Sequence, residues 1–240
     1  MRTTEWPGAA AVNFDAIAEN LPLYLGGALT TLKLLAISLA GGLLVALPLA
    51  VLRNARSRWL RAPVWAYTYA IRGTPLLVQL FLVYYKLAQF AFVRKSIAWP
   101  WLQSAWFCAC LAFGINTCAY TTEIIAGALR NTSRGEIEAA RALGLSEAQV
   151  LLRIVMPSAL RRAIPSYGNE AILMLHGTSL ASVVTLLDIT GVARDVNSRY
   201  YIPFEAFITA GLLYLSITLA LVGLFHAAER RWLAHLAPRT

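Results

Sequence analysis

Residues 133–157 read SRGEIEAARALGLSEAQVLLRIVMP, a polar and charged stretch in a chain that is otherwise mostly apolar. Two pairs of residues within it have the spacing of a helix-starting capping box, Ser133 with Glu136 and Ser146 with Gln149. Gly144 falls between the pairs, where a helix commonly ends on a glycine in the left-handed conformation. Pro157 then ends the second helix or begins the next one. The stretch therefore predicts two short helices joined by a glycine elbow.

The composition of the whole chain places this stretch in a membrane protein. Of the 240 residues, 58% are hydrophobic and only 14% are charged, which is more apolar than a soluble domain of this size requires. The charges are clustered, and the apolar stretches between the clusters reach about 20 residues, enough for a helix to cross a bilayer. We therefore predict an all-α membrane protein.

Five membrane spans are predicted within a single transmembrane domain that covers residues 1–240. A polar lead occupies residues 1–22. The spans lie at about 24–52, 63–90, 105–129, 164–187 and 205–227. Arg72-Gly73-Thr74-Pro75 interrupts the second span, and residues 133–157 connect the third span to the fourth.

The distribution of basic residues predicts how the spans are oriented. Thirteen of the 21 lysines and arginines fall on one side of the predicted spans and six fall on the other. The positive-inside rule then places residues 133–157 and the C-terminus in the cytoplasm, with the N-terminus outside. The positions of the basic residues are explained by their role in orienting the spans. The net charge of +9 therefore gives no reason to expect a nucleic-acid partner.

Apolar faces on the two short helices leave two interpretations open. These faces comprise Ile137, Ala140 and Leu143 on the first helix, and Val150, Leu151, Ile154 and Val155 on the second. Composition alone fits a helical hairpin that lies on the membrane surface. It fits equally a hairpin that docks into a groove on a soluble partner and transmits that partner's movement.

A longer pattern in the same stretch resembles the signature loop of bacterial ABC importer permeases. Glu138-Ala139-Ala140 is followed after three residues by Gly144, and after nine more by Ile154-Val155-Met156-Pro157. Met156 stands where leucine is usual. In that family this loop forms the coupling helix, which sits in a cleft of the ATP-hydrolysing subunit. The resemblance implies that the coupling residues are Glu138, Ala139, Ala140, Gly144, Ile154 and Pro157.

The resemblance extends over nearly the whole chain, and within the family the chain is most similar to the permeases of polar amino-acid importers. The stretches that carry it are RGTPL at 72–76, NTCAYTTE at 116–123, GEIEAARA, PSALRRAIP, NEAILMLH, ARDVNS and AERRW. They most resemble the M-type permease subunit of histidine/lysine/arginine/ornithine or opine importers, and the Q-type subunit is similar. The resemblance implies the type I permease architecture in a bacterial inner membrane, with the N-terminus in the periplasm.

Partners and cofactors also follow from this resemblance. It implies two copies of an ABC ATPase, which bind ATP and Mg, so that no cofactor is held by this chain. It also implies a periplasmic substrate-binding protein and a second permease subunit, a related Q-type chain. Together with the lipid bilayer, these partners would make the chain one subunit of an ATP-driven importer of basic amino acids.

Two carboxylates within the predicted spans mark a candidate substrate path. An ionisable group costs about 2.5–3.5 kcal/mol in a span, so it usually faces a cavity or a partner. Glu123 shares a helix face with Asn116 and Tyr120, and Glu170 lies beside Asn169. Each carboxylate either lines the path or forms a buried hydrogen bond, for which Arg72 is an available partner. Two carboxylates without lysines in the same spans suit a cationic substrate.

Thr178 and Ser179 complete the candidate path. They follow Gly177 and can unwind the fourth span so that their hydroxyls face a ligand. The alternative is ordinary packing of small residues between helices. The candidate path residues are thus Glu123, Asn116, Tyr120, Glu170, Asn169, Arg72, Thr178 and Ser179.

Several sequence motifs are absent. The chain contains no GxxxxGK[ST] phosphate loop, no HExxH and no GxSxG, and its three cysteines have no metal-site spacing. We therefore expect a chain that is not an enzyme and holds no metal, with the ATPase on another polypeptide. The alternative function is a secondary transporter driven by an ion gradient, with Glu123 as its coupling site. The lack of an inverted repeat argues against it.

Overall fold

The computed structural model describes residues 14–233, and the regular structure of these residues is helical throughout. The α-helices are α1 (Phe14–Glu19), α2 (Leu21–Arg53), α3 (Arg58–Arg72), α4 (Leu76–Phe81), α5 (Ala91–Arg94), α6 (Trp99–Leu102), α7 (Ala105–Arg130), α8 (Arg134–Ala142), α9 (Glu147–Gln149), α10 (Met156–Gly177), α11 (Ile189–Tyr200) and α12 (Pro203–Leu233). Two π-helical segments, η1 (Leu82–Lys86) and η3 (Val150–Val155), and two 3₁₀ segments, η2 (Leu87–Gln89) and η4 (Thr178–Val184), connect them.

Three of the described helices, α2, α7 and α12, are long and apolar enough to cross a membrane. A fourth candidate is the bent pair formed by residues 147–184 and α11, which meet at 46°. The predicted second span, 63–90, is not one helix, because α3 ends at Arg72 and α4 begins at Leu76. The helix therefore breaks at Gly73-Thr74-Pro75, as the sequence predicts, and the count of five spans stays a prediction.

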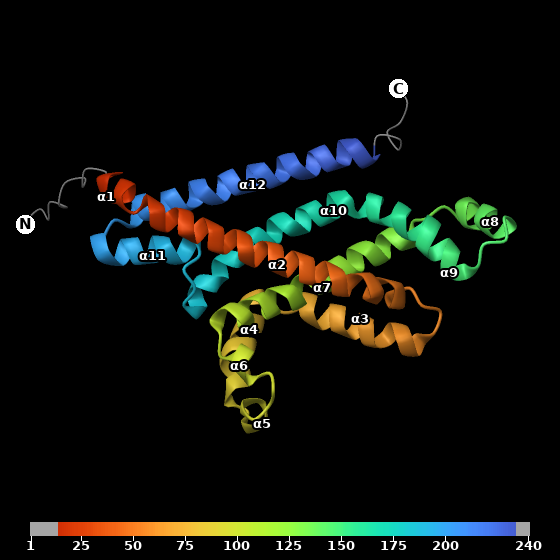
Figure 1. Ribbon diagram of the computed structural model, residues 1–240, viewed down its shortest axis with the longest axis horizontal. Helices are drawn as coiled ribbons and strands as arrows, with labels where there is room; N and C mark the ends of the chain where they lie inside the picture. The colour runs from red at the N-terminus through yellow and green to blue at the C-terminus, as the bar shows by residue number, and fades with distance from the viewer. Residues whose placement is uncertain (1–13, 234–240) are drawn as a thin grey trace, which may run out of the picture.

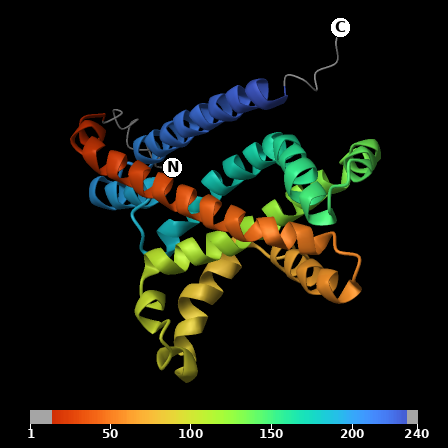
Figure 2. The same ribbon diagram turned by 45° about the vertical axis from the view of Figure 1, so that its right-hand side comes forward.

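The long helices α2 and α7 cross against each other at the centre of the molecule (Figures 1 and 2). The helices α1 and α11 lie at one end of the molecule, and α8 and α9 lie at the other. The segment α4–α6 projects from the side opposite α12. We call the end that carries α8 the basic end, because α2 ends there on Arg53 and α7 ends there on Arg130.

The crossing of α2 and α7 depends on a glycine. A Cβ on Gly42 would lie 2.5 Å from the Cγ2 of Thr117 and 3.1 Å from the backbone nitrogen of Cys118, so a side chain at position 42 would push the two helices apart. Side chains from both helices and from α4 and α10 form the central core beside this crossing, with Leu34, Phe113 and Leu175 fully buried. This core fixes how the polar residues of α7 and α10 face one another.

Candidate functional site

The elbow after α8 has the geometry that the sequence predicts. Gly144 has a φ of +79°, in the left-handed region that favours glycine. Its N–H donates to the carbonyl of Arg141 at 2.9 Å, and the N–H of Leu145 donates to the carbonyl of Ala140 at 3.3 Å, which together form a Schellman motif. No atom lies within 4 Å of a Cβ added to Gly144, so backbone conformation, and not space, requires glycine here.

Of the two predicted capping boxes, one is confirmed and one is wrong. The backbone N–H of Ser146 donates to the side chain of Gln149 at 2.9 Å, and the Ser146 hydroxyl accepts from the Gln149 N–H at 3.4 Å. Ser133 precedes α8, but its side chain accepts no capping hydrogen bond. Its hydroxyl lies 3.7 Å from the position of a Cβ added to Gly135, which is an ordinary van der Waals contact.

The α8 helix packs one face on the bundle and leaves its tip exposed. Ala140 is 4% exposed and contributes to a core cluster with Val150 and Val155, and Ile137 packs against that cluster. Leu143 is 83% exposed, so its predicted place on the same apolar face is wrong. Leu143 is the C-cap residue of α8, where the chain turns into the elbow, and it therefore leaves the helix face.

The remaining coupling candidates divide between the surface and the bundle. Glu138 and Ala139 are exposed on α8. Ile154 packs against the same core cluster as Ala140. Pro157 lies in the first turn of α10, within a helical stretch that is uninterrupted from α9 through η3, so the prediction that it ends one helix or begins another is wrong. The chain from α9 through η3 into α10 is continuous, and α8 is therefore attached to the first turns of a membrane helix.

An ion pair closes the elbow from outside. The Arg141 guanidinium donates to both carboxylate oxygens of Glu147, at 2.8 Å and 3.0 Å. The hydrogen bond from Arg141 holds the pKa of the Glu147 carboxyl below its usual value. Because both side chains are well exposed, solvent screening limits what this pair adds to stability. Its role is to join α8 to α9 across Gly144.

Glu123 lies in a network that joins three helices, and its predicted partner Arg72 is replaced by Arg53. The Nε of Arg53 lies 2.6 Å from Oε1 of Glu123, and the Thr68 hydroxyl donates to the same oxygen at 2.8 Å. The side chains of Arg53 and Glu123 are 18% and 16% exposed. The sequence alone assigned Arg53 to a loop, whereas α2 continues far enough to bring it against α7.

Arg72 faces the other polar residues of α7. Its guanidinium carbon lies 5.1 Å from the ring centroid of Tyr120, a cation–π contact. Within residues 14–233, no carboxylate lies within salt-bridge distance of Arg72. The side chain is exposed at the point where α3 ends. Arg72 and Tyr120 are thus brought together as accessible groups.

Gln79 is a central residue that the sequence reasoning missed. Its Nε2 donates to the carbonyl of Ile71 at 2.7 Å and to the Thr74 hydroxyl at 2.8 Å, so it holds the break between α3 and α4. Its Oε1 accepts from Nδ2 of Asn116 at 3.0 Å, which links that break to α7. The available signal was a lone amide in the apolar run LLVQLF directly after the helix-breaking Gly73-Thr74-Pro75.

Glu170 is a buried carboxyl without an ion-pair partner in the described part of the chain. It lies on α10 and is 5% exposed. The Thr117 hydroxyl of α7 is also buried and has no hydrogen-bond partner within residues 14–233. Asn169 points elsewhere: it is exposed and lines a cavity of about 170 Å³ beside α12. The structure therefore separates the buried Glu170 from the exposed Asn169.

Thr178 and Ser179 lie where the helix changes type. The α-helical pattern ends at Gly177 and continues from Thr178 as the 3₁₀ helix η4, which is wound more tightly, so the predicted unwinding is not observed. Both hydroxyls donate to backbone carbonyls three residues earlier, Thr178 at 2.6 Å and Ser179 at 2.7 Å. Their protons are thus used within the helix, and they lie about 12 Å along the axis from Glu170.

The pairing of Glu123 with Arg53 predicts a stability effect. We expect Glu123→Gln to lower the free energy of unfolding in detergent by about 1.5–3 kcal/mol, the usual value of a hydrogen bond to a charged group. The double variant Arg53→Gln/Glu123→Gln measures the coupling in a double-mutant cycle. Additive losses would show that the pair is not coupled, and a change in substrate preference at unchanged stability would show that Glu123 contacts substrate instead.

Comparisons with known proteins agree with one another. Residues 38–234 match the family described as "Binding-protein-dependent transport system inner membrane component". The chain is 45% identical over 219 residues to the nopaline transport system permease protein NocM of Agrobacterium fabrum, which covers 91% of each protein. It is 47% identical over 214 residues to the histidine/lysine/arginine/ornithine transport system permease protein HisM of Salmonella typhimurium, covering 89% of this chain and 91% of that one.

A solved structure has the same fold. It is described as the crystal structure of an amino acid ABC transporter with histidines. The TM-score is 0.82 at 32% sequence identity, and the match covers 92% of this chain and 100% of the other.

Proposed function

Because the chain belongs to the family of binding-protein-dependent transport system inner membrane components and is a permease subunit of an ABC importer, we propose that it carries basic amino acids. The candidate substrates are histidine, arginine, lysine, ornithine and arginine-derived opines. The relatives named for histidine/lysine/arginine/ornithine and for nopaline transport support this choice. The observation that carries it is the buried Glu170 carboxyl, which lacks an ion-pair partner within residues 14–233.

Arg72 and Glu170 are the two charged groups that we assign to the substrate. The Arg72 guanidinium is accessible, and it can bind the carboxylate of an amino acid in a two-pronged hydrogen bond. Glu170 can then receive a cationic group on the same molecule, because its carboxyl is buried and has no salt-bridge partner within residues 14–233. Tyr120 and Asn116 position this site, through the cation–π contact and through Gln79.

The other candidate path residues take supporting roles in this proposal. Glu123 holds α2, α3 and α7 together, and its hydrogen bonds to Arg53 and Thr68 support that role. Thr178 and Ser179 mark the point where α10 changes to a 3₁₀ helix, and we assign them to a hinge that bends when the path changes conformation. Asn169 faces the cavity beside α12, at the outer wall of the path.

The exposed tip of α8 is the surface that we assign to the ATPase. Glu138, Ala139 and Gly144 would contact the ATPase cleft, because they are exposed at the basic end. Ala140, Ile154 and Pro157 would transmit the movement, because they pack on the bundle or begin α10. The partner ATPase, in two copies, would bind ATP and Mg.

The remaining partners and the orientation complete the proposal. Basic residues gather at the end that carries α8, which supports a cytoplasmic position for that end and for the C-terminus, with the N-terminus in the periplasm. A periplasmic substrate-binding protein would deliver substrate at the opposite end. A related Q-type chain would supply the second half of the path.

Uptake by the reconstituted transporter tests this function. The chain is co-expressed with its ATPase and second permease, placed in vesicles and supplied with binding protein. We expect uptake of radiolabelled arginine or histidine only when ATP is present on the side of the membrane that carries the ATPase. The purified chain alone should show no ATPase activity. Uptake that survives ATP depletion and collapses with an uncoupler would instead establish the ion-gradient transporter, which neither the comparisons nor the Glu123 geometry favours.

A further inference from the structure

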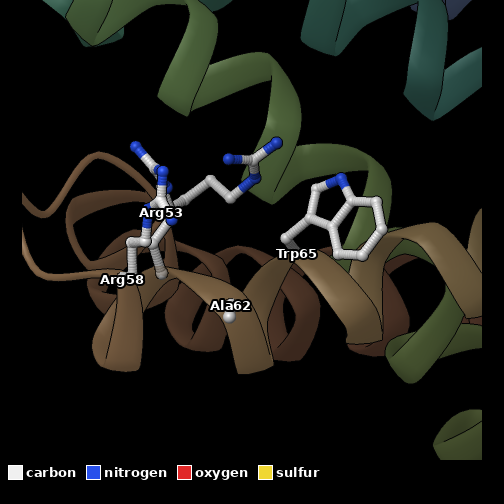
Figure 3. Close-up of a pocket in the computed structure, with 5 residues that line it drawn as sticks. Arg53, Arg58, Ala62 and Trp65 are labelled. Carbon is white, nitrogen blue, oxygen red and sulfur yellow. The ribbon is translucent and has the colours of Figure 1, made fainter.

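A cavity of about 410 Å³ lies at the turn between α2 and α3, at the basic end of the molecule. Its walls are Arg53, Arg58, Arg61, Ala62 and Trp65. Figure 3 shows Arg53, Arg58 and Trp65 extending from the backbone towards the same side, so that the guanidinium groups and the indole share one space. None of these residues belongs to the substrate site or to the α8 tip.

The charge of this cavity is unbalanced. Arg53 is paired with Glu123, which leaves Arg58 and Arg61 as two further cations. Within residues 14–233 neither of these two arginines lies within 4.0 Å of a carboxylate. Guanidinium groups present several N–H donors in a planar fork that matches phosphate oxygens. The cavity therefore has the chemistry of a site for a phosphate group.

The surroundings of the cavity are apolar and lie at the edge of the membrane. The α2 helix is long and apolar enough to cross a bilayer and ends at Arg53, so the cavity lies at the level where a span leaves the membrane. Trp65 lines the cavity, and its ring stacks on that of Tyr69 one turn further along α3, with the ring centroids 5.3 Å apart; both side chains are exposed. Tryptophan is enriched at this depth, where its ring lies among lipid headgroups. A free phosphate ion would use the arginines but not these apolar side chains.

We propose that this cavity binds the headgroup of an anionic phospholipid, with the lipid phosphate on Arg58 and Arg61. The acyl chains would lie along the exposed aromatic side chains on the same face of α3, Trp65 and Tyr69. Arg53 connects the site to Glu123 on α7, because its Nε is held by that carboxylate while it lines the cavity. A bound lipid would thus brace the helix whose end leads into α8.

Native mass spectrometry of the purified transporter complex tests the lipid site. The complex is titrated with phosphatidylglycerol and, separately, with phosphatidylcholine of the same acyl chains. One arginine near a lipid phosphate is worth about 1 kcal/mol, or about fivefold in affinity. We therefore expect Arg58→Gln/Arg61→Gln to lower the preference for phosphatidylglycerol by about 25-fold. Because both side chains are exposed and have no salt-bridge partner within residues 14–233, the variant should fold, and its gel-filtration profile checks this.

The matched control is Arg230→Gln/Arg231→Gln, which removes the same charge from exposed residues in the last turn of α12. It should keep the preference for phosphatidylglycerol. The proposal is overturned if both double variants lose the preference equally, since diffuse charge then explains it, or if neither loses it. A third arm adds inorganic phosphate: displacement of phosphatidylglycerol at comparable concentration would make this a free-anion site and not a lipid site.

Discussion

Gly144→Val is expected to reduce ATP-driven uptake by about 5- to 30-fold while the chain still folds and inserts. A left-handed conformation costs an ordinary residue about 1–2 kcal/mol, and a β-branched residue is particularly disfavoured there. That strain can be relieved only by opening the Schellman motif at Gly144, which reorients α8. A cost of about 1–2 kcal/mol lowers the fraction of molecules that keep the native elbow by about 5- to 30-fold, which is the expected loss of uptake.

Two control variants separate the elbow from the helix around it. Gly144→Asn should keep most of the uptake, because asparagine tolerates the left-handed conformation. Gly135→Ala, on the same helix but without a positive φ, should be neutral or slightly stabilising. Uptake, ATPase activity and co-purification with the ATPase are measured for each. If Gly144→Val transports like the parent protein, the elbow does not set the position of α8 on its partner.

Glu170→Gln is the second change with a large expected effect. It replaces a buried carboxylate by an amide of nearly the same shape, so packing is kept and the charge is lost. If this carboxylate receives the cationic group of the substrate, its loss removes about 1.5–3 kcal/mol. Uptake of arginine at limiting concentration should then fall by about 10- to 150-fold. Basal ATPase activity should be retained.

The control for Glu170 makes the same chemical change elsewhere. Among residues 14–233 the ion-pair partner of Glu229 on α12 is His226, at 3.4 Å, and Glu229 lines the cavity beside α12, apart from the assigned substrate groups Arg72 and Glu170, so Glu229→Gln should leave uptake unaffected. Glu170→Asp keeps the charge and should recover part of the activity. Equal uptake of arginine by Glu170→Gln and the parent protein would assign the carboxyl a purely structural role and would remove the physical basis for a cationic substrate.

Local features of the fold could be predicted from sequence because few residues decide each of them. The left-handed Gly144, the Ser146–Gln149 capping box and the break at Gly73-Thr74-Pro75 all depend on backbone geometry within one or two turns. The prediction for Ser133 was wrong, because Ser133 occupies the N-cap position of α8 but its side chain accepts no capping hydrogen bond.

The partners of the polar residues could not be predicted in the same way. Glu123 pairs with Arg53, 70 positions earlier, and Asn116 binds Gln79, 37 positions earlier. Each pairing depends on how far a helix continues and where two helices cross, which Gly42 sets by letting α2 approach α7. The spacing of residues within a single span does not predict which residues of another helix they will contact.

By itself, then, the sequence determined that this protein is an all-helical membrane protein with a glycine elbow at Gly144, because hydropathy, helix caps and positive φ are encoded by neighbouring residues; the permease family followed from its resemblance to importer permeases. Only the tertiary structure decided that Glu123 braces the bundle through Arg53, and that Glu170 stays without an ion pair among the described residues. The reason is physical: the charge state and role of a carboxylate in a span depend on the side chains that other helices bring to it.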